Sequence, residues 1–509
     1  MSLPKNSVII IVTLIAWFGS SYAQVQSPGS PGTFKNIIFI VGDDHSSRVL
    51  GAYGNKIIRT PNLDRMAQRG VLFENAFVSS PLCSPSRQSI LTGKYPHATG
   101  VSILKSAFPE EQVTIADYLT PQGFKTAIIG KNHFNNNFNH GFELKVERKD
   151  YEKHLVSNPP RKLPDSVKVR SQWKPFVDPA NIWLNADGLP SSQYDKEQAG
   201  TYYANRAIEF IQGSKDGRFL LWIGFEEPHS PFNFPVEYAK KYDAKSISLP
   251  QGSPEDDRWV PKIFKNLTDE EKKGITASYY SSVEFLDKNI GLVLDVVEKA
   301  GLAHNTLIIY LGDNGYQLND HKRFEKHTMW EQSVRVPLII QAGNKFGKNR
   351  RVQALTSFVD LVPTALDALG VTSMPTAQGR SFLPLLKEQT KQYRDFIFSE
   401  YLEDNKAMVR TAKWKYVFTS GKHDLALGYA TGNPAPGILH FLYDEVNDPK
   451  ETHNLASAVN NKSILLDLQR KMISVFEQTH PKGKLPNNLS MDEKLVIYCE
   501  PPELEVKGL

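Results

Sequence analysis

Short apolar runs alternate along the chain with longer stretches in which apolar residues recur every three or four positions. The short runs are rich in Ile, Val and Leu, which is typical of strands buried on both faces of a parallel sheet. The longer stretches are typical of amphipathic helices packed on such a sheet. The alternation therefore predicts an α/β fold, a doubly wound sheet with helices on both faces.

Four of the predicted strands end in residues that carry chemistry. The strands are residues 36–41, 126–129, 219–225 and 306–310, and they lead into Gly42-Asp43-Asp44-His45, Gly130-Lys131-Asn132-His133, Glu226-Glu227-Pro228-His229 and Gly312-Asp313-Asn314-Gly315. Ligands of open α/β sheets bind beyond the carboxyl ends of the strands. One charged turn is ordinary, but four such strand ends predict a single active site at that edge of the sheet.

Helix signals fall between these strands. Thr60 and Pro61 begin one helix, and Thr268 begins a longer one that stops at Gly301. The apolar stripe of the long helix indicates core packing. By contrast, residues 147–192 are polar and rich in proline, which predicts a long loop over the site.

The pattern changes after a predicted helix at residues 359–369. Antiparallel strands and then a last helix are predicted at residues 395–401, 407–418, 441–443 and 463–479. These features predict a catalytic domain at residues 34–385 and a smaller C-terminal α+β subdomain with an antiparallel sheet at residues 386–509.

The first residues have the pattern of a secretory signal peptide. Lys5 precedes an apolar run at residues 8–18, and Ser21-Tyr22-Ala23 is a small-residue cleavage site. The run is shorter than the roughly 20 residues that a membrane span needs, and no other segment is apolar enough to span. We therefore expect residues 1–23 to be removed and the protein to be exported to the periplasm or the extracellular space.

Composition narrows the class of ligand. The chain of 509 residues carries 60 basic and 55 acidic residues, a net charge of +5, without a basic block. This balance argues against nucleic-acid binding but is compatible with an anionic substrate. Cys83 and Cys499 are the two cysteines. Two cysteines in an exported protein favour a disulfide by default, but the residues around Cys83 favour another role.

Cys83 begins the motif Cys83-Ser84-Pro85-Ser86-Arg87, which is followed by Leu91-Thr92-Gly93. Pro85 suits the first turn of a helix, which places Cys83 at the helix N-terminus. The helix dipole favours negative charge on a nucleophile or a bound anion there. The local chemistry alone is also compatible with a thiol nucleophile of low pKa.

The motif C-x-P-S-R followed by L-T-G resembles the signature of the type I sulfatases, in which this cysteine is oxidised to formylglycine. The resemblance continues through residues 60–64, 313–315, 335–338, 442–444 and 454–455. It implies an alkaline-phosphatase-like fold and, as a partner, a formylglycine-generating, sulfatase-maturing enzyme. Within this family, the chain resembles the bacterial polysaccharide sulfatases.

The resemblance also implies roles for individual residues. Asp43, Asp44, Asp313 and Asn314 match the ligands of one metal ion, and oxygen ligands of this kind suit Ca²⁺. Arg87 matches the residue that braces the modified cysteine. The remaining matches to catalytic groups are Lys131, His133, His229 and Lys326.

The implied reaction is hydrolysis of a sulfate ester with release of inorganic sulfate. One hydroxyl of the hydrated aldehyde at position 83 attacks sulfur, and His229 or Lys326 protonates the leaving alcohol. His133 then removes the proton from the second hydroxyl of the sulfated intermediate, which expels sulfate. A plain serine or cysteine has no second hydroxyl and would stop at that stage.

A sulfated polysaccharide or oligosaccharide is the expected substrate. Aromatic side chains that can pack on sugar rings are predicted at the rim of the site: Phe134, Phe138, Phe142, Tyr316 and Trp330. Polar side chains expected to contact the substrate are His45, Asn132, His140, His321, Arg323 and His327.

Two other interpretations remain open at this point. A phosphonate or phosphodiester hydrolase of the same superfamily can share the motif, although Lys131 and Lys326 with one metal ion fit a singly charged sulfate ester. An inactive carbohydrate-binding homologue would be expected to have lost part of the motif, and none of its residues is missing.

Overall fold

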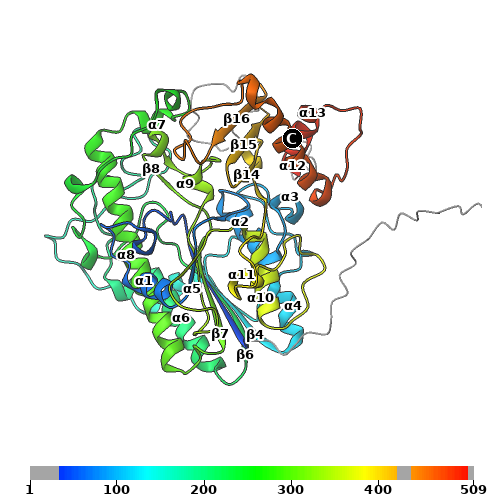
Figure 1. The fold of residues 1–509 in the computed structure, drawn as a ribbon. Helices are drawn as coiled ribbons and strands as arrows, with labels where there is room; N and C mark the ends of the chain where they lie inside the picture. Colours follow the sequence, from blue (N-terminus) through cyan, green and yellow to red (C-terminus); the bar gives the residue numbers. More distant parts are fainter. Residues whose placement is uncertain (1–33, 421–436, 503–509) are drawn as a thin grey trace, which may run out of the picture.

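The computed structural model describes residues 34–420 and 437–502. The predicted signal peptide at residues 1–23 lies outside the described residues. An eight-stranded mixed sheet forms the centre of the molecule (Figure 1). Its strands, in spatial order, are β11 (Arg350–Val352), β2 (Val71–Phe73), β10 (Leu338–Gln341), β7 (Thr306–Gly312), β1 (Asn36–Gly42), β6 (Arg218–Gly224), β4 (Phe124–Gly130) and β5 (Leu144–Val146).

The four strands predicted to carry chemistry are neighbours in this sheet. β1 pairs in parallel with both β7 and β6, and β6 pairs in parallel with β4. Their carboxyl ends therefore lie side by side. β10 runs antiparallel to β7 and β2, so the sheet is doubly wound as predicted but not parallel throughout.

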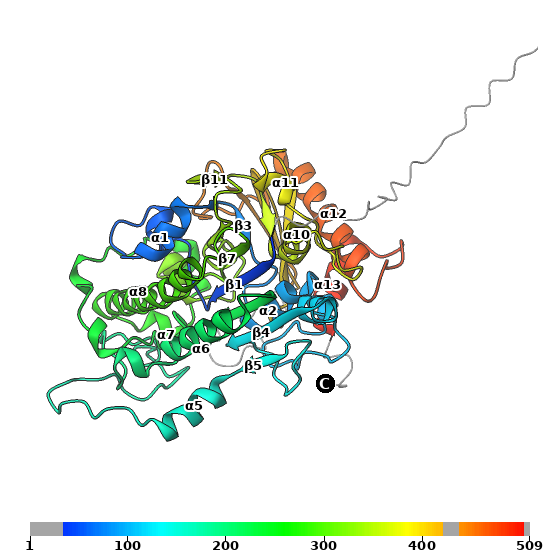
Figure 2. The ribbon, with the colours of Figure 1, turned by 90° about the horizontal axis from the view of Figure 1, so that it is seen from below.

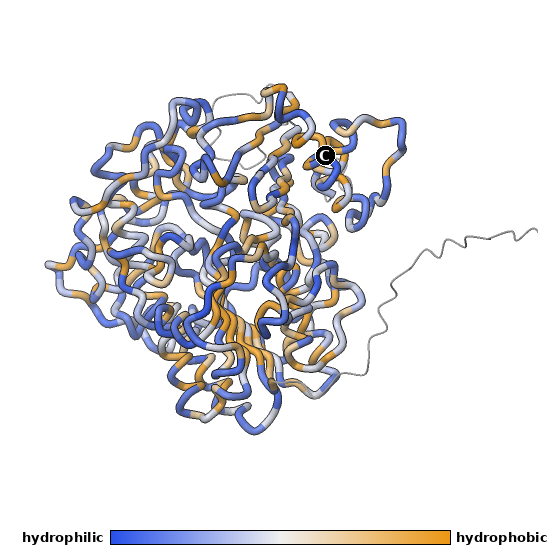
Figure 3. Tube along the Cα trace, viewed as in Figure 1, coloured by the Kyte–Doolittle hydropathy of each residue, from blue (hydrophilic) through white to orange (hydrophobic). Residues whose placement is uncertain are grey.

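The two faces of the sheet are covered by different helices, as Figure 2 shows. In β1, Ile38 and Ile40 face the core shared with helices α1 (Pro61–Gln68), α6 (Ala199–Ser214) and α8 (Asp269–Lys299). The alternate residues Ile37, Phe39 and Val41 face the core shared with α2 (Cys83–Thr92), α4 (Ile115–Leu119), α10 (Leu361–Ala368) and α11 (Leu383–Leu386). The strands stand out as an apolar band between these layers (Figure 3). Both faces of the strands are buried, which explains their nearly continuous apolar sequences.

The two predicted helix starts are confirmed, by different contacts. α8 begins with a capping box, in which the Thr268 hydroxyl accepts a hydrogen bond from the backbone N–H of Glu271, and the Glu271 carboxylate accepts one from that of Thr268. In α1, however, the cap comes from another helix. The carboxylate of Asp287 in α8 accepts hydrogen bonds from the backbone N–H groups of Asn62 and Leu63, at 3.1 and 2.8 Å.

The predicted loop at residues 147–192 is partly wrong. Its first part is helix α5 (Arg148–Ser157), and residues 158–192 form no helix or strand. A reciprocal capping box between Glu147 and Asp150 begins α5. The helix carries few apolar residues, since only Tyr151 is buried, so a search for an apolar stripe overlooks it.

The C-terminal region forms an antiparallel sheet and two helices. The sheet consists of β13 (Phe396–Tyr401), β14 (Lys406–Thr411), β15 (Trp414–Thr419) and β16 (Leu439–Asp444), and it packs on α12 (Lys462–Thr479) and α13 (Met491–Tyr498). β13, β16 and α12 follow the predicted positions. The predicted stretch at residues 407–418 is divided between β14 and β15, and α13 was not predicted. Cys499 is buried in this core, and both cysteines are free. Among the described residues, no helix combines the length and apolar character that crossing a membrane requires.

The remaining elements are short and connect the main ones. They are β3 (Ala76–Phe77), β12 (Thr356–Ser357), β8 (Gln317–Leu318), β9 (Phe324–Glu325), α3 (Pro96–Thr99), α7 (Lys262–Lys265) and α9 (Glu331–Val334). β8, β9 and α9 follow β7 and bring residues 317–334 back over the carboxyl edge of the sheet.

Candidate active site

Cys83 is the first residue of α2, as its motif predicts, and its side chain is buried. Its Sγ atom lies 2.8 Å from Nζ of Lys326 and 3.7 Å from Oδ1 of Asp44. Burial raises the pKa of the Cys83 thiol well above its usual value, although Lys326 and Lys131 oppose this effect. The open alternative of a low-pKa thiol nucleophile is therefore not supported.

Three carboxylates and one amide gather beside Cys83. Asp43 and Asp44 follow β1, and Asp313 and Asn314 follow the neighbouring β7. The backbone N–H of Asp44 donates to Oδ1 of Asp313 at 3.0 Å, and Nδ2 of Asn314 donates to Oδ1 of Asp44 at 2.8 Å. Side-chain ligand atoms of Asp43, Asp44, Asp313 and Cys83 all lie within 4.8 Å of one another.

This cluster fits a metal cation. Three of its buried oxygens, Asp43 Oδ1, Asp44 Oδ2 and Asn314 Oδ1, have no hydrogen-bond partner. Buried polar atoms normally find partners, so these oxygens are suited to coordinate a cation. Burial raises the pKa of Asp313 to about 6 in spite of the neighbouring Arg87. Oxygen donors alone favour a hard cation over zinc.

Three cationic side chains hold the carboxylate cluster. Arg87, fully buried in α2, donates through Nε to Oδ2 of Asp313 at 2.8 Å and through Nη1 to the carbonyl of Lys131 at 2.7 Å. Lys131, at the end of β4, forms an ion pair with Asp43, and Lys326 forms one with Asp44. Arg87 therefore joins two strand ends, and a surface role for this arginine is excluded.

The two predicted catalytic histidines line the same cleft beside this cluster. His133 follows β4, and its Nδ1 lies 3.0 Å from the hydroxyl of Ser84. His229 follows β6; its Nδ1 donates to the carbonyl of Ser230 at 2.7 Å, and its Nε2 lies 3.8 Å from Oδ2 of Asp44. Burial, reinforced by Lys131, lowers the pKa of both rings and so favours their neutral forms.

An open cleft of about 660 Å³ leads to these groups. Asp43, Lys131, His133 and His229 line it, together with Asn132, which donates to Glu147 at 3.0 Å. Sequence reasoning missed other lining residues: Asn135, Asn136, Arg148, Tyr203, Glu226 and Asn233. Arg148 and Glu226 form an ion pair of 2.7 Å across the cleft. Glu226 follows a buried strand directly, which was the available signal, whereas Arg148 lay in the predicted loop.

The six predicted substrate contacts have different surroundings. Asn132 lines the cleft, and His321 lines a separate hollow. His327 is partly exposed and packs against Tyr401. Arg323 is nearly buried and donates to the carbonyl of Trp259, so it shapes a loop and lies outside the lining of the cleft.

His45 and His140 require a correction. His45 is fully buried, and its two nitrogens contact the Tyr310 hydroxyl and the Val49 carbonyl. His140 is nearly buried and packs between the rings of Phe108 and Phe134. Burial lowers the pKa of each imidazole to about 4. Both imidazoles are buried, and neither lines the cleft.

The predicted aromatic rim is mostly wrong. Phe134, Phe142 and Tyr316 are buried and belong to the core. Phe138, which is 46% exposed, and Trp330, which is partly exposed, remain available at the surface. Aromatic residues in a sequence more often fill a core than a binding site, because they bury the largest apolar area.

The candidate metal ligand Asp44 lies in a turn of strained backbone. Asp44 has φ = 64°, which is uncommon for a residue with a side chain. Tyr279 of α8 holds this turn: its hydroxyl donates to the carbonyl of Asp44 at 2.5 Å and accepts from the backbone N–H of Ser46 at 2.9 Å. Sequence reasoning assigned Tyr279 to core packing and missed this second contact.

Known proteins resemble this chain over most of its length. The chain is 26% identical to an N-acetylglucosamine-6-O-sulfatase of Bacteroides thetaiotaomicron, over 91% of this chain and 89% of that protein. It is 27% identical to an ulvan-active sulfatase of Formosa agariphila, over 88% of this chain and 81% of that one. The crystal structure of a phosphonate monoester hydrolase of Agrobacterium radiobacter superposes with a TM-score of 0.72 at 21% identity, covering 87% and 96% of the two chains.

Two family models match the sequence. The model for the C-terminal region of N-sulphoglucosamine sulphohydrolase matches residues 319–478. The sulfatase model matches residues 35–371, a range that contains Cys83, both histidines, both lysines and all four candidate metal ligands. Since this range is more than half of the chain, the protein belongs to the sulfatase family and is a sulfatase enzyme.

Proposed function

We propose that this protein removes sulfate from a sulfated polysaccharide or oligosaccharide, with residue 83 oxidised to formylglycine and Ca²⁺ bound beside it. The observation that carries the proposal is the position of Cys83. The cysteine of the C-x-P-S-R motif begins a helix and lies beside both Lys326 and the carboxylate cluster, where a sulfate group would be near positive charge.

The metal would be held by Asp43, Asp44, Asp313 and Asn314, three of which present oxygens without a hydrogen-bond partner. Ca²⁺ accepts six to eight oxygen ligands in flexible geometry, which suits carboxylates and an amide from two adjacent loops. When bound, the cation supplies positive charge for an oxygen of the sulfate group. Because Asn314 is neutral, the four candidate ligands carry three negative charges. Lys131, Lys326 and Arg87 lie close enough to offset part of this charge.

The protein residues have separable tasks. Lys131 and Lys326 hold positive charge at two sides of the nucleophile, because each is fixed by an ion pair to a metal-binding aspartate. Arg87 keeps the ends of β4 and β7 together through Lys131 and Asp313. His133 is neutral and can accept a proton from residue 83, and His229 or Lys326 can serve the leaving alcohol.

A sulfated sugar is supported by the cleft as well as by the relatives. The N-acetylglucosamine-6-O-sulfatase and the ulvan-active sulfatase are named for carbohydrate substrates. The open cleft is lined by asparagines, Arg148 and Glu226, which can hydrogen-bond to sugar hydroxyls. The apolar run at residues 8–18 supports export, and formation of formylglycine requires a maturing enzyme as a partner.

The decisive experiment joins chemistry at position 83 to sulfate release. The peptide that spans residue 83 in the active enzyme should be lighter than the thiol form, as an aldehyde is. Cys83→Ala should abolish sulfate release from an aryl sulfate and leave the thermal unfolding temperature unchanged. Cys499→Ala, at the other free cysteine, is the matched control and should keep full activity. A fully active enzyme with an alkylatable thiol at position 83 would overturn the proposal.

The same preparation separates the remaining alternatives. Under the proposal, turnover of an aryl sulfate exceeds that of an aryl phosphodiester or phosphonate monoester. The reverse order would assign the protein to the phosphonate hydrolases. The similarity to the phosphonate monoester hydrolase of Agrobacterium radiobacter shows only a common fold. Carbohydrate binding without turnover of any ester would support the inactive homologue.

A further inference from the structure

Three hollows outside the catalytic cleft join into one groove. A hollow of about 930 Å³ shares Pro250, Gln251 and Gly252 with a second one of about 230 Å³. The second shares Asp256 and Thr452 with a third of about 360 Å³. We call the whole the seam groove, because its walls come from the sulfatase domain and, at residues 441–454, from the C-terminal region.

One end of the seam groove is basic. The first hollow is lined by five lysines and two aspartates, Lys245, Lys265, Lys272, Lys273, Lys322, Asp257 and Asp269. The aspartates pair with Lys272 and Lys322. Among the described residues, no carboxylate forms an ion pair with Lys245, Lys265 or Lys273. These three cations therefore keep their charge available for an anionic ligand.

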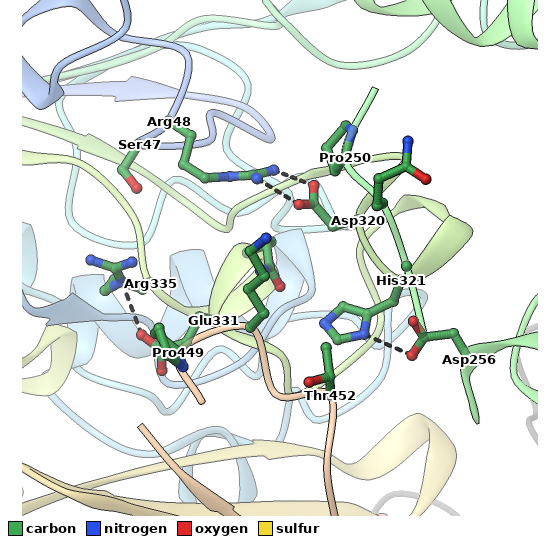
Figure 4. A pocket seen from close by; sticks show the side chains of 14 residues that line it. Ser47, Arg48, Pro250, Asp256, Asp320, His321, Glu331, Arg335, Pro449 and Thr452 are labelled. Atoms are coloured by element: carbon green, nitrogen blue, oxygen red, sulfur yellow. Dashed lines mark hydrogen bonds and ion pairs between the residues drawn. The ribbon is translucent and has the colours of Figure 1, made fainter. Parts of the chain in front are cut away.

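The middle of the groove is a set of fixed polar groups (Figure 4). Arg48 pairs with Asp320, His321 contacts Asp256 at 2.9 Å, and Arg335 pairs with Glu331 at 2.9 Å. In Figure 4 these pairs surround the hollow from different segments of the chain. Such pairs are already ordered, so they can offer hydrogen bonds to a ligand at little entropic cost.

The other end is aromatic. The third hollow is lined by Trp259, Trp330, Phe441 and Tyr443. Trp259 meets Phe441 edge to face at 5.9 Å, and Trp330 lies parallel to His321 at 3.9 Å between ring centres. Both tryptophans are partly exposed, so they present apolar surface of the kind that packs on sugar rings.

The groove and the active site share chain segments. Ser47 and Arg48 of the groove come three and four residues after Asp44, and Lys326 lies between the groove segments 320–321 and 331–335. A ligand bound along the groove is thus held by the same segments that carry the nucleophile's partners.

We infer that the seam groove binds an anionic carbohydrate chain, the part of the substrate that extends beyond the sulfate ester under attack. The inference rests on the proposed function and deepens it: the preferred substrate is a chain of several sugars bearing more than one anionic group. The basic end binds further sulfate or carboxylate groups, and the aromatic end packs against sugar rings.

Binding to a sulfated dextran oligosaccharide tests the inference without turnover. The wild-type full-length enzyme should bind it tightly at low salt, more weakly at high salt, and much more tightly than unsulfated dextran. The triple variant Lys245→Ala, Lys265→Ala, Lys273→Ala should lose about ten-fold in affinity and part of the salt dependence. Trp259→Ala should lose a similar factor without a change in the salt dependence.

Charge-matched and activity controls make the result specific. The variant Lys215→Ala, Lys299→Ala, Lys348→Ala removes the same charge from exposed lysines that do not line the groove and should bind like wild type. All variants should keep the wild-type rate on a small aryl sulfate.

Several results would overturn the groove assignment. They are equal losses in the control triple, equal binding of unsulfated dextran, or tighter binding of a single-stranded DNA oligonucleotide than of the sulfated chain. If the wild-type enzyme does not hydrolyse an aryl sulfate, the proposed function is contradicted. The binding measurement does not require turnover, so it tests the groove separately.

Discussion

His133 and His229 line the same cleft, but their Nδ1 atoms face different groups. The Nδ1 of His229 must carry a hydrogen, because its neighbour is a carbonyl oxygen, that of Ser230. In the neutral ring, Nε2 is then a bare acceptor that points toward Asp44. The Nδ1 of His133 faces the hydroxyl of Ser84, which can donate or accept. The tautomer is therefore fixed for His229 and free for His133. To act as a general acid, His229 must gain a second proton on Nε2, which the nearby carboxylate of Asp44 favours.

The roles of the two histidines can be separated by the choice of leaving group. An aryl sulfate has a good leaving group and hardly needs a general acid, whereas a sugar sulfate does. If His229 serves the leaving alcohol, His229→Ala should lower kcat roughly 10²–10⁴-fold on the sugar sulfate and much less on the aryl ester. His133→Ala should impair both substrates and leave a sulfate adduct on residue 83, detectable by intact mass. Equal losses for His229→Ala on the two substrates would move the acid role to Lys326.

At the scale of secondary-structure elements, Asp287 couples α8 to the start of α1. Its carboxylate caps α1 through Asn62 and Leu63, and burial raises its pKa to about 6. The folded state therefore holds this proton more tightly than the unfolded state does, whose pKa is near 3.8. The resulting stabilisation is complete below pH 4 and is lost as the pH rises through about 6.

This pH dependence predicts the behaviour of Asp287→Asn. The variant cannot ionise, so its free energy of unfolding should lack the decrease of about 3 kcal/mol that Asp287 contributes between pH 4 and 7. Urea unfolding at several pH values measures the difference. Asp295→Asn, on the same helix but half-exposed, should keep the wild-type pH profile. An unchanged profile for Asp287→Asn would show that the carboxyl does not titrate in this range.

The C-terminal sheet is tied to α9 by a buried ion cluster. Lys415 of β15 is fully buried and lies 3.0 Å from Glu331 of α9, 2.7 Å from Glu451 and 3.7 Å from Glu445. The pKa of Glu445 is raised to about 8 by burial, in spite of Lys415, and by the other two carboxylates. Without the lysine, three buried carboxyl groups would face one another.

We therefore expect Lys415→Met to lower the free energy of unfolding by about 3–5 kcal/mol. Lys413 lies two residues away, is exposed, and pairs with Asp444 at 3.6 Å. Lys413→Met should therefore lower the free energy of unfolding by at most about 1 kcal/mol. Denaturant unfolding of both variants measures the contrast. If both variants lose only a little free energy of unfolding, then water or proton uptake by the carboxylates compensates for the missing Lys415.

For the whole molecule, the candidate metal ligands come from the ends of β1 and β7, which are neighbours at the centre of the sheet. Chelation should therefore lower activity and thermal stability together, because the carboxylates of Asp43, Asp44 and Asp313 are left to repel one another. A ligand present at 100 times its Kd stabilises by about 2.7 kcal/mol, which corresponds to a shift of several degrees in Tm. Added Ca²⁺ should restore both. Stoichiometric zinc in the purified protein, or indifference to chelator, would refute the assignment.

Sequence patterns predicted the framework of the molecule better than its surface. The four buried strands and α8 could be found because burial on both faces, or on one helical stripe, leaves a strong apolar pattern. The strand ends were then placed correctly because parallel neighbours share one edge. β10, α5 and α13 are short or polar, and their positions depend on tertiary partners that no local pattern records.

The candidate site was predicted unevenly for a related physical reason. Cys83, Arg87 and the carboxylates are held at defined positions in motifs, and the structure brings them together. His45, His140 and three of the five aromatic residues were expected to face the substrate but are buried. A sequence gives the chemistry of a side chain but not its solvent exposure, so the same imidazole fits a subsite or a core equally well.

The pairing of β1 with β7 has a consequence during protein synthesis. Asn36 pairs with Thr306, and the lysine that touches Cys83 is 243 residues further along the chain. At typical synthesis rates, residue 326 follows residue 83 after on the order of 10–50 s. Throughout that interval β1 lacks its neighbour β7, so we expect Cys83 to stay accessible to an enzyme that oxidises it. Once β7 joins the sheet, Cys83 is only 1% exposed. The proposed oxidation of Cys83 should therefore take place before β7 pairs with β1.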